Sequence, residues 1–432
     1  MSAVRRKRRD LFQNLSIVLL SLSAVVLFTQ TQLDTLADGR GGYWDRLMGS
    51  PSASAGPAAD PGLAGLAAPV RVAVSNAFGR YGDISLTTQD FSAAGSQNNL
   101  GSLLKEALGT AQPSAVCTEA DFLAALDRTS VYYDFWEPLP LSVLAGLVGG
   151  DLEDGGAEAR RLAVSAEDDG SVRLYLWDGE SRYTRCAVAV SAASLSEVVN
   201  AYELGNAFFA FDAAEEIGPP PVEPCSFFLR TQPDLPVLSA APSLSDARAL
   251  LSALGFNPDT KSRYTESGGT EVIMDGDRTL RIRTDGDVLY TSGGEPTLTV
   301  KADGEVPTAQ EAAAGAGALL SGLAGELMGD ASFYLKSLTR TGNATVLQFG
   351  CQVSGVPIRL SGADCAAEVT LTDAAVSSLS LRFRQYAATD GSSLLLPLRQ
   401  ALAIAAGDPG RELCVGYADS GSSTVSAAWL LE

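Results

Sequence analysis

The stretch RTLRIRTDGDVLY, residues 278–290, shows the pattern that decides the fold class. Apolar and polar residues alternate in its first part, a short segment with Asp285 and Gly286 follows, and VLY resumes the strand pattern. Asp-Gly pairs readily take the positive φ angles that tight hairpins need. The stretch therefore predicts two antiparallel strands joined by a tight turn.

Similar strand patterns recur along the chain. A second hairpin is predicted around VRLYLW, residues 172–177, which stands between two Asp-Gly segments. Further alternating runs lie at residues 333–339, 345–353, 368–371, 376–384, 413–417 and 424–430.

Helix signals lie between these strands. A Ser or Thr followed three residues later by a carboxylate can cap a helix start, and Thr118, Ser194, Ser243 and Thr308 show this spacing. A fifth helix is predicted over residues 394–406, with Pro397 in its first turn and Leu395, Leu398 and Leu402 facing inward. Hairpins interspersed with isolated helices predict an α+β fold with antiparallel sheets.

Residues 11–28, LFQNLSIVLLSLSAVVLF, contain no charge, and the uncharged stretch extends to residue 33. A helix needs about 20 such residues to cross a bilayer. The segment therefore predicts a transmembrane anchor over residues 11–32. Five cations precede it and would hold the short tip, residues 1–10, in the cytoplasm; they are Arg5, Arg6, Lys7, Arg8 and Arg9.

Two alternatives to the anchor fit the sequence less well. A cleaved signal peptide has the same charge order but ends in a small-x-small site, which is missing near residue 28. A buried soluble helix fits the preceding cations poorly. We therefore expect a single-pass cell-membrane protein whose C-terminal body is extracytoplasmic.

Polar and small residues within the span suggest contact with a partner helix, because such residues permit close approach and interhelical hydrogen bonds. Ser16 and Ser23 are seven residues apart and lie nearly on one face. Serines without a helix partner are also common in single-pass anchors. The candidate contact residues are Asn14, Ser16, Leu19, Leu20, Ser23 and Val26.

The remaining chain divides by composition. Residues 33–69 are dominated by Gly, Ala, Ser, Pro and Asp, which is typical of a flexible tether. Beyond it we expect an N-terminal α+β region at 70–235, a middle domain at 236–365 and a C-terminal unit at 366–432.

Charge and composition exclude several function classes. The chain holds 31 Lys and Arg against 51 Asp and Glu, a net charge of −20, which disfavours nucleic acid as a partner. Histidine is absent, which excludes Ser-His-Asp and Cys-His centres and zinc sites that use histidine. No motif for a cofactor was found.

Two short motifs match only parts of known functional sites. Ser102 and Lys105 match the Ser-x-x-Lys spacing of penicillin-binding enzymes, but the companion motifs are missing. The Asp-Gly-Asp segments at 275–277 and 285–287 resemble parts of calcium loops, but their position between strands favours turns. The six cysteines contain no Cys-x-x-Cys, and disulfides or buried free thiols both remain open.

Three stretches together resemble the YycH/YycI family of membrane-anchored extracytoplasmic regulators of a cell-wall sensor kinase in Gram-positive bacteria. They are YYDFWEPLPLSVLAGLVG at 132–149, the segment 254–292 with its Asp-Gly-Asp-Arg turn, and residues 394–431, which resemble a closing unit similar to a PepSY domain. The resemblance implies a noncatalytic protein with a sensor histidine kinase, or another envelope membrane protein, as partner. It also implies a related regulator as a heteromer partner.

These observations support a leading hypothesis and two alternatives. The first is a noncatalytic, membrane-anchored regulator of a two-component sensor kinase. The second is an extracytoplasmic module that binds cell-wall polymer, peptide or a protease. The third is an enzyme that uses carboxylates alone, for which no pair of acids stands out in the sequence.

Overall fold

The structure is a computed structural model. The residues that it describes are 66, 71–84, 100–112, 115–213, 217–218, 220–244, 247–293, 298–304 and 306–432. The predicted basic tip, membrane span, helix-contact residues and nearly all of the tether lie outside these ranges. None of the described helices is long and apolar enough to cross a membrane.

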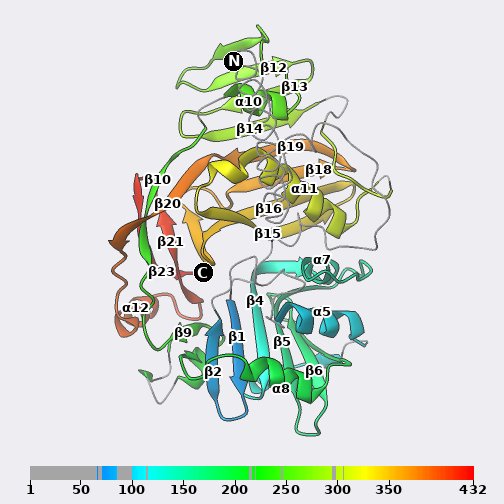
Figure 1. Cartoon of the computed structure of the whole chain (residues 1–432), viewed down its shortest axis with the longest axis vertical. Helices are drawn as coiled ribbons and strands as arrows, with labels where there is room; N and C mark the ends of the chain where they lie inside the picture. The colour runs from blue at the N-terminus through cyan, green and yellow to red at the C-terminus, as the bar shows by residue number, and fades with distance from the viewer. Residues whose placement is uncertain are drawn as a thin grey trace, which may run out of the picture. The chain divides into compact units, whose positions relative to one another are not determined.

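Residues 71–229 contribute a nine-stranded antiparallel sheet with the order β3-β7-β6-β5-β4-β1-β2-β8-β9 (Figure 1). Its strands are β1 (Arg71–Asn76), β2 (Arg80–Ile84), β3 (Ala115–Cys117), β4 (Ser130–Pro140), β5 (Glu158–Ala166), β6 (Val172–Trp177), β7 (Tyr183–Ala187), β8 (Ala207–Phe209) and β9 (Phe227–Leu229). The predicted hairpin around VRLYLW is β5–β6–β7.

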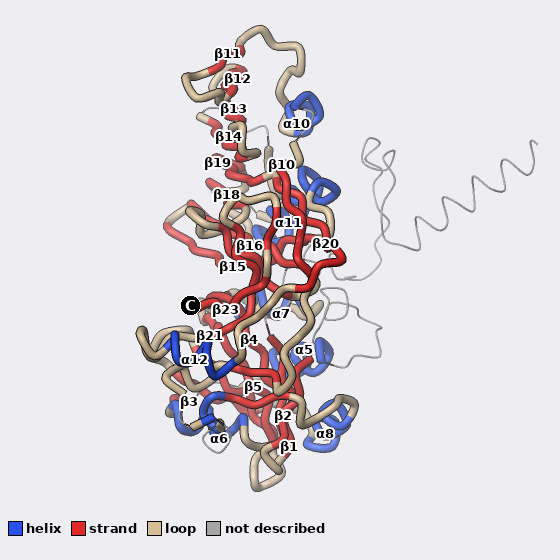
Figure 2. Tube along the Cα trace, turned by 90° about the vertical axis from the view of Figure 1, so that its left-hand side faces the viewer, coloured by secondary structure: helices blue, strands red, loops and turns tan. Residues whose placement is uncertain are grey.

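Helices pack on both faces of this sheet. They are α5 (Leu100–Thr110), α6 (Glu119–Leu126), α7 (Leu141–Leu147) and α8 (Ala192–Asn200), and a short 3₁₀ turn follows at Ala210–Asp212. Successive strand residues point to opposite faces, so Val72 and Val74 enter one core cluster while Ala73 enters the other. Figure 2 shows α6 and α8 on opposite sides of the strands.

An eleven-stranded sheet follows, with the order β11-β12-β13-β14-β19-β18-β16-β17-β21-β23 and β15 paired to β16. Its strands are β11 (Arg263–Thr265), β12 (Glu271–Asp275), β13 (Arg278–Ile282), β14 (Asp287–Ser292), β15 (Ala331–Thr341), β16 (Ala344–Val353), β17 (Val356–Leu360), β18 (Ala367–Thr372), β19 (Ala375–Arg382), β21 (Leu413–Asp419) and β23 (Ala427–Leu431). β17 and β21 pair in parallel, whereas the other strand pairs of this sheet in the described residues are antiparallel.

Three further strands and three helices complete the described chain. The strands β10 (Pro236–Pro242), β20 (Arg384–Ser392) and β22 (Thr424–Val425) form a small sheet. The helices are α10 (Ala247–Ala253), α11 (Ala309–Ala324), which continues as a 3₁₀ turn at Gly325–Leu327, and α12 (Leu398–Ala405).

The predicted fold class, α+β with mostly antiparallel sheets, is confirmed. The hairpin predicted at residues 278–290 is β13–β14, in which Leu280 lies opposite Tyr290 and both are buried. Strands on either side of the expected boundary at residue 365 pair with one another, as in β14–β19 and β16–β18. The segments 236–365 and 366–432 therefore share one sheet.

Two predicted helix caps are confirmed. The Thr118 hydroxyl accepts a hydrogen bond from the backbone N–H of Asp121 at 3.2 Å, and the Asp121 carboxylate accepts one from the Thr118 N–H at 2.8 Å. Thr308 and Glu311 make the same reciprocal pair at the start of α11. These caps satisfy backbone N–H groups that have no partner within the helix.

Two other predicted helix starts were wrong. The cap of α8 is Ser191, whose hydroxyl accepts from the Ser194 N–H at 3.0 Å, so Ser194 lies inside the helix. The helix predicted at 394–406 begins only at Leu398. Pro397 restricts the residue before it to extended backbone, which prevents an earlier start of the helix. Leu394 lies outside the helix and is 94% exposed. The cap predicted at Ser243 needs Asp246, which lies outside the described residues.

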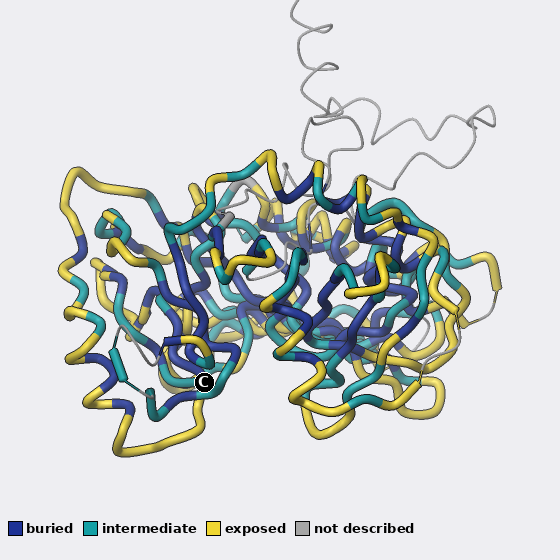
Figure 3. Tube along the Cα trace, turned by 90° about the horizontal axis from the view of Figure 1, so that it is seen from below, coloured by how far each residue is buried: buried dark blue, intermediate teal, exposed yellow. Residues whose placement is uncertain are grey.

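One hydrophobic cluster extends through both large sheets. It includes Leu162 and Val164 of the nine-stranded sheet and Leu347 and Phe349 of the eleven-stranded sheet. α7 packs against α11 and so continues this core between them. In Figure 3 the buried residues run through the interior of the trace and the exposed ones lie on its outer loops.

Candidate functional site

A row of charged residues crosses the centre of the nine-stranded sheet. β4 lies between β1 and β5, and the register places Asp134 directly opposite Arg71 on one side and Arg161 on the other. Trp177 lies opposite Arg161 on the next strand, and the Arg161 guanidinium stands 4.5 Å from the centre of its ring. Cross-strand neighbours have Cβ atoms roughly 5 Å apart, so the pairing brings these groups into contact.

Asp134 is the centre of this row. Its side chain is 1% exposed, and its Oδ2 accepts from Arg71 Nη2 at 3.0 Å and from the Tyr132 hydroxyl at 3.1 Å. The Nε atoms of Arg161 and Arg160 lie 3.5 and 3.7 Å from its Oδ1. Three arginines therefore surround one buried carboxylate.

A second carboxylate reaches the cluster from the far end of the chain. Glu412 directly precedes β21, and its Oε2 accepts from Arg161 Nη2 at 2.9 Å. Arg160 and Arg71 also form ion pairs with Glu412. Reciprocal backbone hydrogen bonds of 3.1 and 2.9 Å join Glu412 to Glu432 and hold it at the end of the β21–β23 pair.

The third carboxylate is Glu223, from the loop before β9. Its Oε1 accepts from Arg161 Nη1 at 2.6 Å. We call the six residues Arg71, Arg160, Arg161, Asp134, Glu223 and Glu412 the charge cluster. Its formal charges balance, which lessens the large free-energy cost of burying ions.

The cluster shifts the pKa values of its members. Burial opposes ionisation of Asp134, but the neighbouring Arg161, Arg71 and Arg160 outweigh it and hold the Asp134 pKa below its usual range. Burial also disfavours the charged form of Arg161, while Tyr132, Asp134 and the other acids nearby raise its pKa above the usual value. Both groups therefore stay ionised at neutral pH.

Hydrogen bonding within the charge cluster is incomplete. The buried atoms without a hydrogen-bond partner include Arg71 Nε and Nη1, Asp134 Oδ1, Arg161 Nε and Glu223 Oε2. An unmade hydrogen bond to a buried polar group costs about 1–3 kcal/mol. The charge cluster is thus neutral overall, but several of its buried donors and acceptors make no hydrogen bond.

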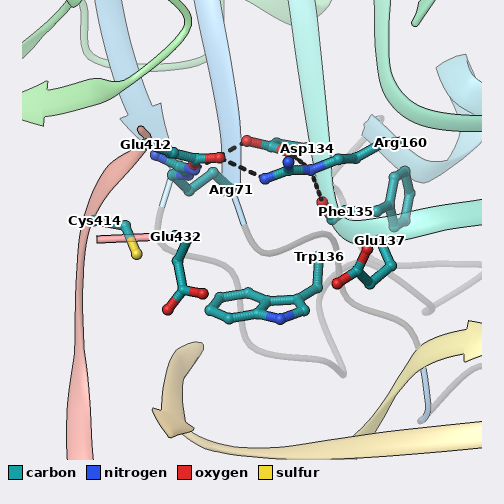
Figure 4. Close-up of a pocket in the computed structure, with 9 residues that line it drawn as sticks. All are labelled: Arg71, Asp134, Phe135, Trp136, Glu137, Arg160, Glu412, Cys414 and Glu432. Atoms are coloured by element: carbon teal, nitrogen blue, oxygen red, sulfur yellow. Dashed lines mark hydrogen bonds and ion pairs between the residues drawn. The ribbon is translucent and has the colours of Figure 1, made fainter. Parts of the chain in front are cut away.

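A cavity of about 120 Å³ adjoins the charge cluster (Figure 4). Arg71, Arg160, Asp134 and Glu412 converge on one side of it, and Trp136, Glu137, Cys414 and Glu432 lie on the other.

The thiol of Cys414 lines this cavity. Burial raises its pKa to about 11, although Arg71 acts in the opposite direction. Because the thiolate is the nucleophilic form, the Cys414 thiol reacts only slowly at neutral pH. All six cysteines, which lie in the described ranges, are free thiols.

The residues singled out from the sequence lie elsewhere. Ser102 and Lys105 are exposed on α5. The Asp-Gly-Asp segments form the turns between β12, β13 and β14, with positive φ at Gly276 and Gly286. The membrane-contact residues lie outside the described ranges.

Sequence reasoning missed the charge cluster. The only local signal is a charged residue inside an apolar strand, as with Asp134 in VYYDF and Arg161 before LAVSA. Such interruptions indicate a buried or paired charge, but they do not show which residue of opposite charge pairs with it.

No protein-family model matches this chain, and no curated protein or solved structure matches it significantly.

Proposed function

We propose that this chain is a noncatalytic, membrane-anchored extracytoplasmic regulator of a cell-envelope two-component sensor kinase. The basic tip, the apolar span at 11–28 and the tether support an anchored protein whose body faces outward. The resemblance to YycH/YycI proteins supports a sensor kinase as the partner. In this proposal the span packs beside the kinase helices, and the body changes that contact.

The observation that carries the proposal is the ion pairing of Glu412 with three arginines of the nine-stranded sheet. These pairs connect the N-terminal sheet with β21, which belongs to the eleven-stranded sheet. Buried ion pairs contribute little net stability compared with apolar packing, but their loss costs much. A junction of this kind suits a body that changes between two arrangements.

Regulation through such a body needs a difference in contact energy. A single span can act on a kinase only if it packs better against one kinase state than against the other. A coupling free energy of about 1–3 kcal/mol corresponds to a 5- to 150-fold difference in affinity between the two kinase states. The polar face of Ser16 and Ser23 is the proposed contact surface.

The first experiment exchanges the span. Replacing residues 11–28 with an unrelated apolar helix should abolish regulation of the kinase, measured as phosphorylation of its response regulator in cells. Protein amount and membrane location should stay unchanged. Unaltered signalling after this exchange would show that the helix-contact mechanism is wrong.

A finer test uses matched serines. Ser16→Leu with Ser23→Leu removes the polar face and should weaken regulation. Ser21→Leu makes the same change on the opposite side of the helix and should leave regulation intact. Equal effects from both sets would contradict a specific helix contact.

A second candidate is an extracytoplasmic binding module for cell-wall polymer, peptide or a protease. A cleft of about 430 Å³ favours it, because its lining includes the carboxylates Glu137, Asp154 and Glu158. Arg340 also lines the cleft and pairs with Asp154 at 3.3 Å. Burial, together with the nearby Asp154, raises the Glu158 pKa. Three carboxylates against one guanidinium leave the lining with a net negative charge, so the cleft fits a polar, cationic ligand.

Co-sedimentation of the full chain in nanodiscs with purified cell-wall material tests this candidate. Glu158→Gln should reduce binding, and Glu180→Gln, on an exposed turn, should not. No sedimentation above background, or equal binding by both variants, would exclude the cleft as a wall-binding site.

A further inference from the structure

A second cavity, of about 220 Å³, lies between the nine-stranded sheet and the C-terminal strands. Most of its lining is apolar and comes from distant parts of the chain. The walls include Leu229 on β9, Leu235 before β10, Val356 on β17, and Val415 and Trp429 on the β21–β23 pair. We call this space the junction cavity.

The loop that contributes Gln232 and Leu235 to the wall of the junction cavity is held to residues 392–396 by hydrogen bonds. Gln232 Nε2 donates to the Leu396 carbonyl at 2.5 Å, and the Ser393 N–H donates to the Leu235 carbonyl at 2.7 Å. The Ser392 hydroxyl also donates to Asp234 at 2.5 Å.

The volume and the lining of the junction cavity determine which kind of ligand it can hold. An apolar cavity of roughly 150 Å³ stays dry and binds benzene, so 220 Å³ has room for a larger ring. Ligand sites are typically apolar, carry few polar groups and lie at domain interfaces. Arg71, Asp83, Gln232 and Ser354 provide the polar groups.

We propose that the junction cavity binds a small molecule through an aromatic ring or a branched aliphatic group. The favourable binding free energy comes from dispersion contacts between the ligand and the cavity walls and from apolar area removed from water. This proposal does not rest on the kinase partner or on the membrane span.

The ligand would act directly on the charge cluster. Arg71 and Cys414 line both the junction cavity and the cavity beside the cluster. Arg71 pairs with Asp134 and Glu412. A bound group therefore contacts a residue that joins the N-terminal sheet to β21.

The test uses 5-fluoroindole as probe and the full chain in lipid nanodiscs. Fluorine NMR should show a saturable bound signal. Val415→Phe and Leu235→Phe fill the cavity from two different elements, and each should abolish that signal. Val116→Phe makes the same change on exposed β3, where Val116 is 75% exposed, and should leave binding unchanged.

Protection of Cys414 gives a readout that needs no variant. Labelling by a small methanethiosulfonate is measured at about pH 9, where more of the Cys414 thiol is ionised. At ten times the dissociation constant of 5-fluoroindole it should slow about tenfold, because only the unliganded fraction reacts. Peptide mass spectrometry assigns the labelled cysteine. No saturable signal, an unchanged labelling rate, or a signal kept by a folded cavity-filling variant would each overturn the proposal.

Discussion

Arg161 Nη2 lies 2.9 Å from Glu412 Oε2, although 251 positions separate the two residues in the chain. Arg161 is 1% and Glu412 5% exposed, so this ion pair is screened from solvent. It ties the centre of the N-terminal sheet to the strand that follows Glu412. Because the contact is buried, a single substitution in it should change the free energy of unfolding measurably.

Glu412→Gln should destabilise the fold strongly, because it leaves the arginines with too little negative charge. Removing one partner of a buried ion pair typically costs about 3–5 kcal/mol. Urea unfolding of the full chain measures the loss. Asp259→Asn, which breaks the exposed pair with Arg248, is the matched control and should cost about 1 kcal/mol or less. A similar small cost for Glu412→Gln would refute the importance of the charge cluster.

Acid should weaken the charge cluster. The Asp134 pKa is lower in the folded state than in the unfolded state. Protonation of Asp134 therefore favours the unfolded state. Its contribution to stability is complete above the unfolded pKa, about 4, and is lost as pH falls through the lower folded pKa. Unfolding free energies from pH 6 downward should show this loss. NMR titration of the Asp134 carboxyl should give a midpoint below its usual range, and a raised midpoint would contradict the cluster geometry.

The start of α8 offers a test of the corrected cap. Ser191→Ala removes the hydroxyl that accepts from the Ser194 N–H and should cost about 1 kcal/mol. Ser194→Ala lies inside the helix and should change stability little, because alanine favours helices. Thermal unfolding of both variants distinguishes the two positions. A larger cost at Ser194 would restore the original prediction.

Close backbone packing explains why position 82 is glycine. A Cβ at Gly82, on β2, would overlap the backbone carbonyl oxygen of Glu203. Gly82→Ala should therefore destabilise the fold by about 1–3 kcal/mol. Gly109→Ala in α5 is the control, since nothing lies near its Cβ position, and it should stabilise slightly. Equal stability of the two variants in urea would contradict the described packing.

Local sequence patterns predicted the elements well where neighbours in the chain decide them. The β13–β14 hairpin and the caps at Thr118 and Thr308 each depend on groups a few residues apart. The predictions at Ser194 and at residues 394–398 were wrong for a local reason as well. The helix α8 is capped by Ser191, three residues before Ser194, and α12 is preceded by Pro397.

The candidate site could not be predicted in this way. Asp134, Arg161 and Glu412 look ordinary among 51 acidic and 31 basic residues, because many pairings are possible. Only the register of β1, β4 and β5 places Arg71 and Arg161 beside Asp134. The junction cavity has the same origin, since its walls come from elements far apart in the sequence.

The amino-acid order alone therefore determined the class of fold, the hairpin turns and the confirmed helix caps, because backbone hydrogen bonding over a few residues controls them. The tertiary structure decided which strands pair across residue 365, which charges meet at Glu412 and where cavities remain. These features depend on the packing of distant segments, whose side chains meet only after both sheets have formed.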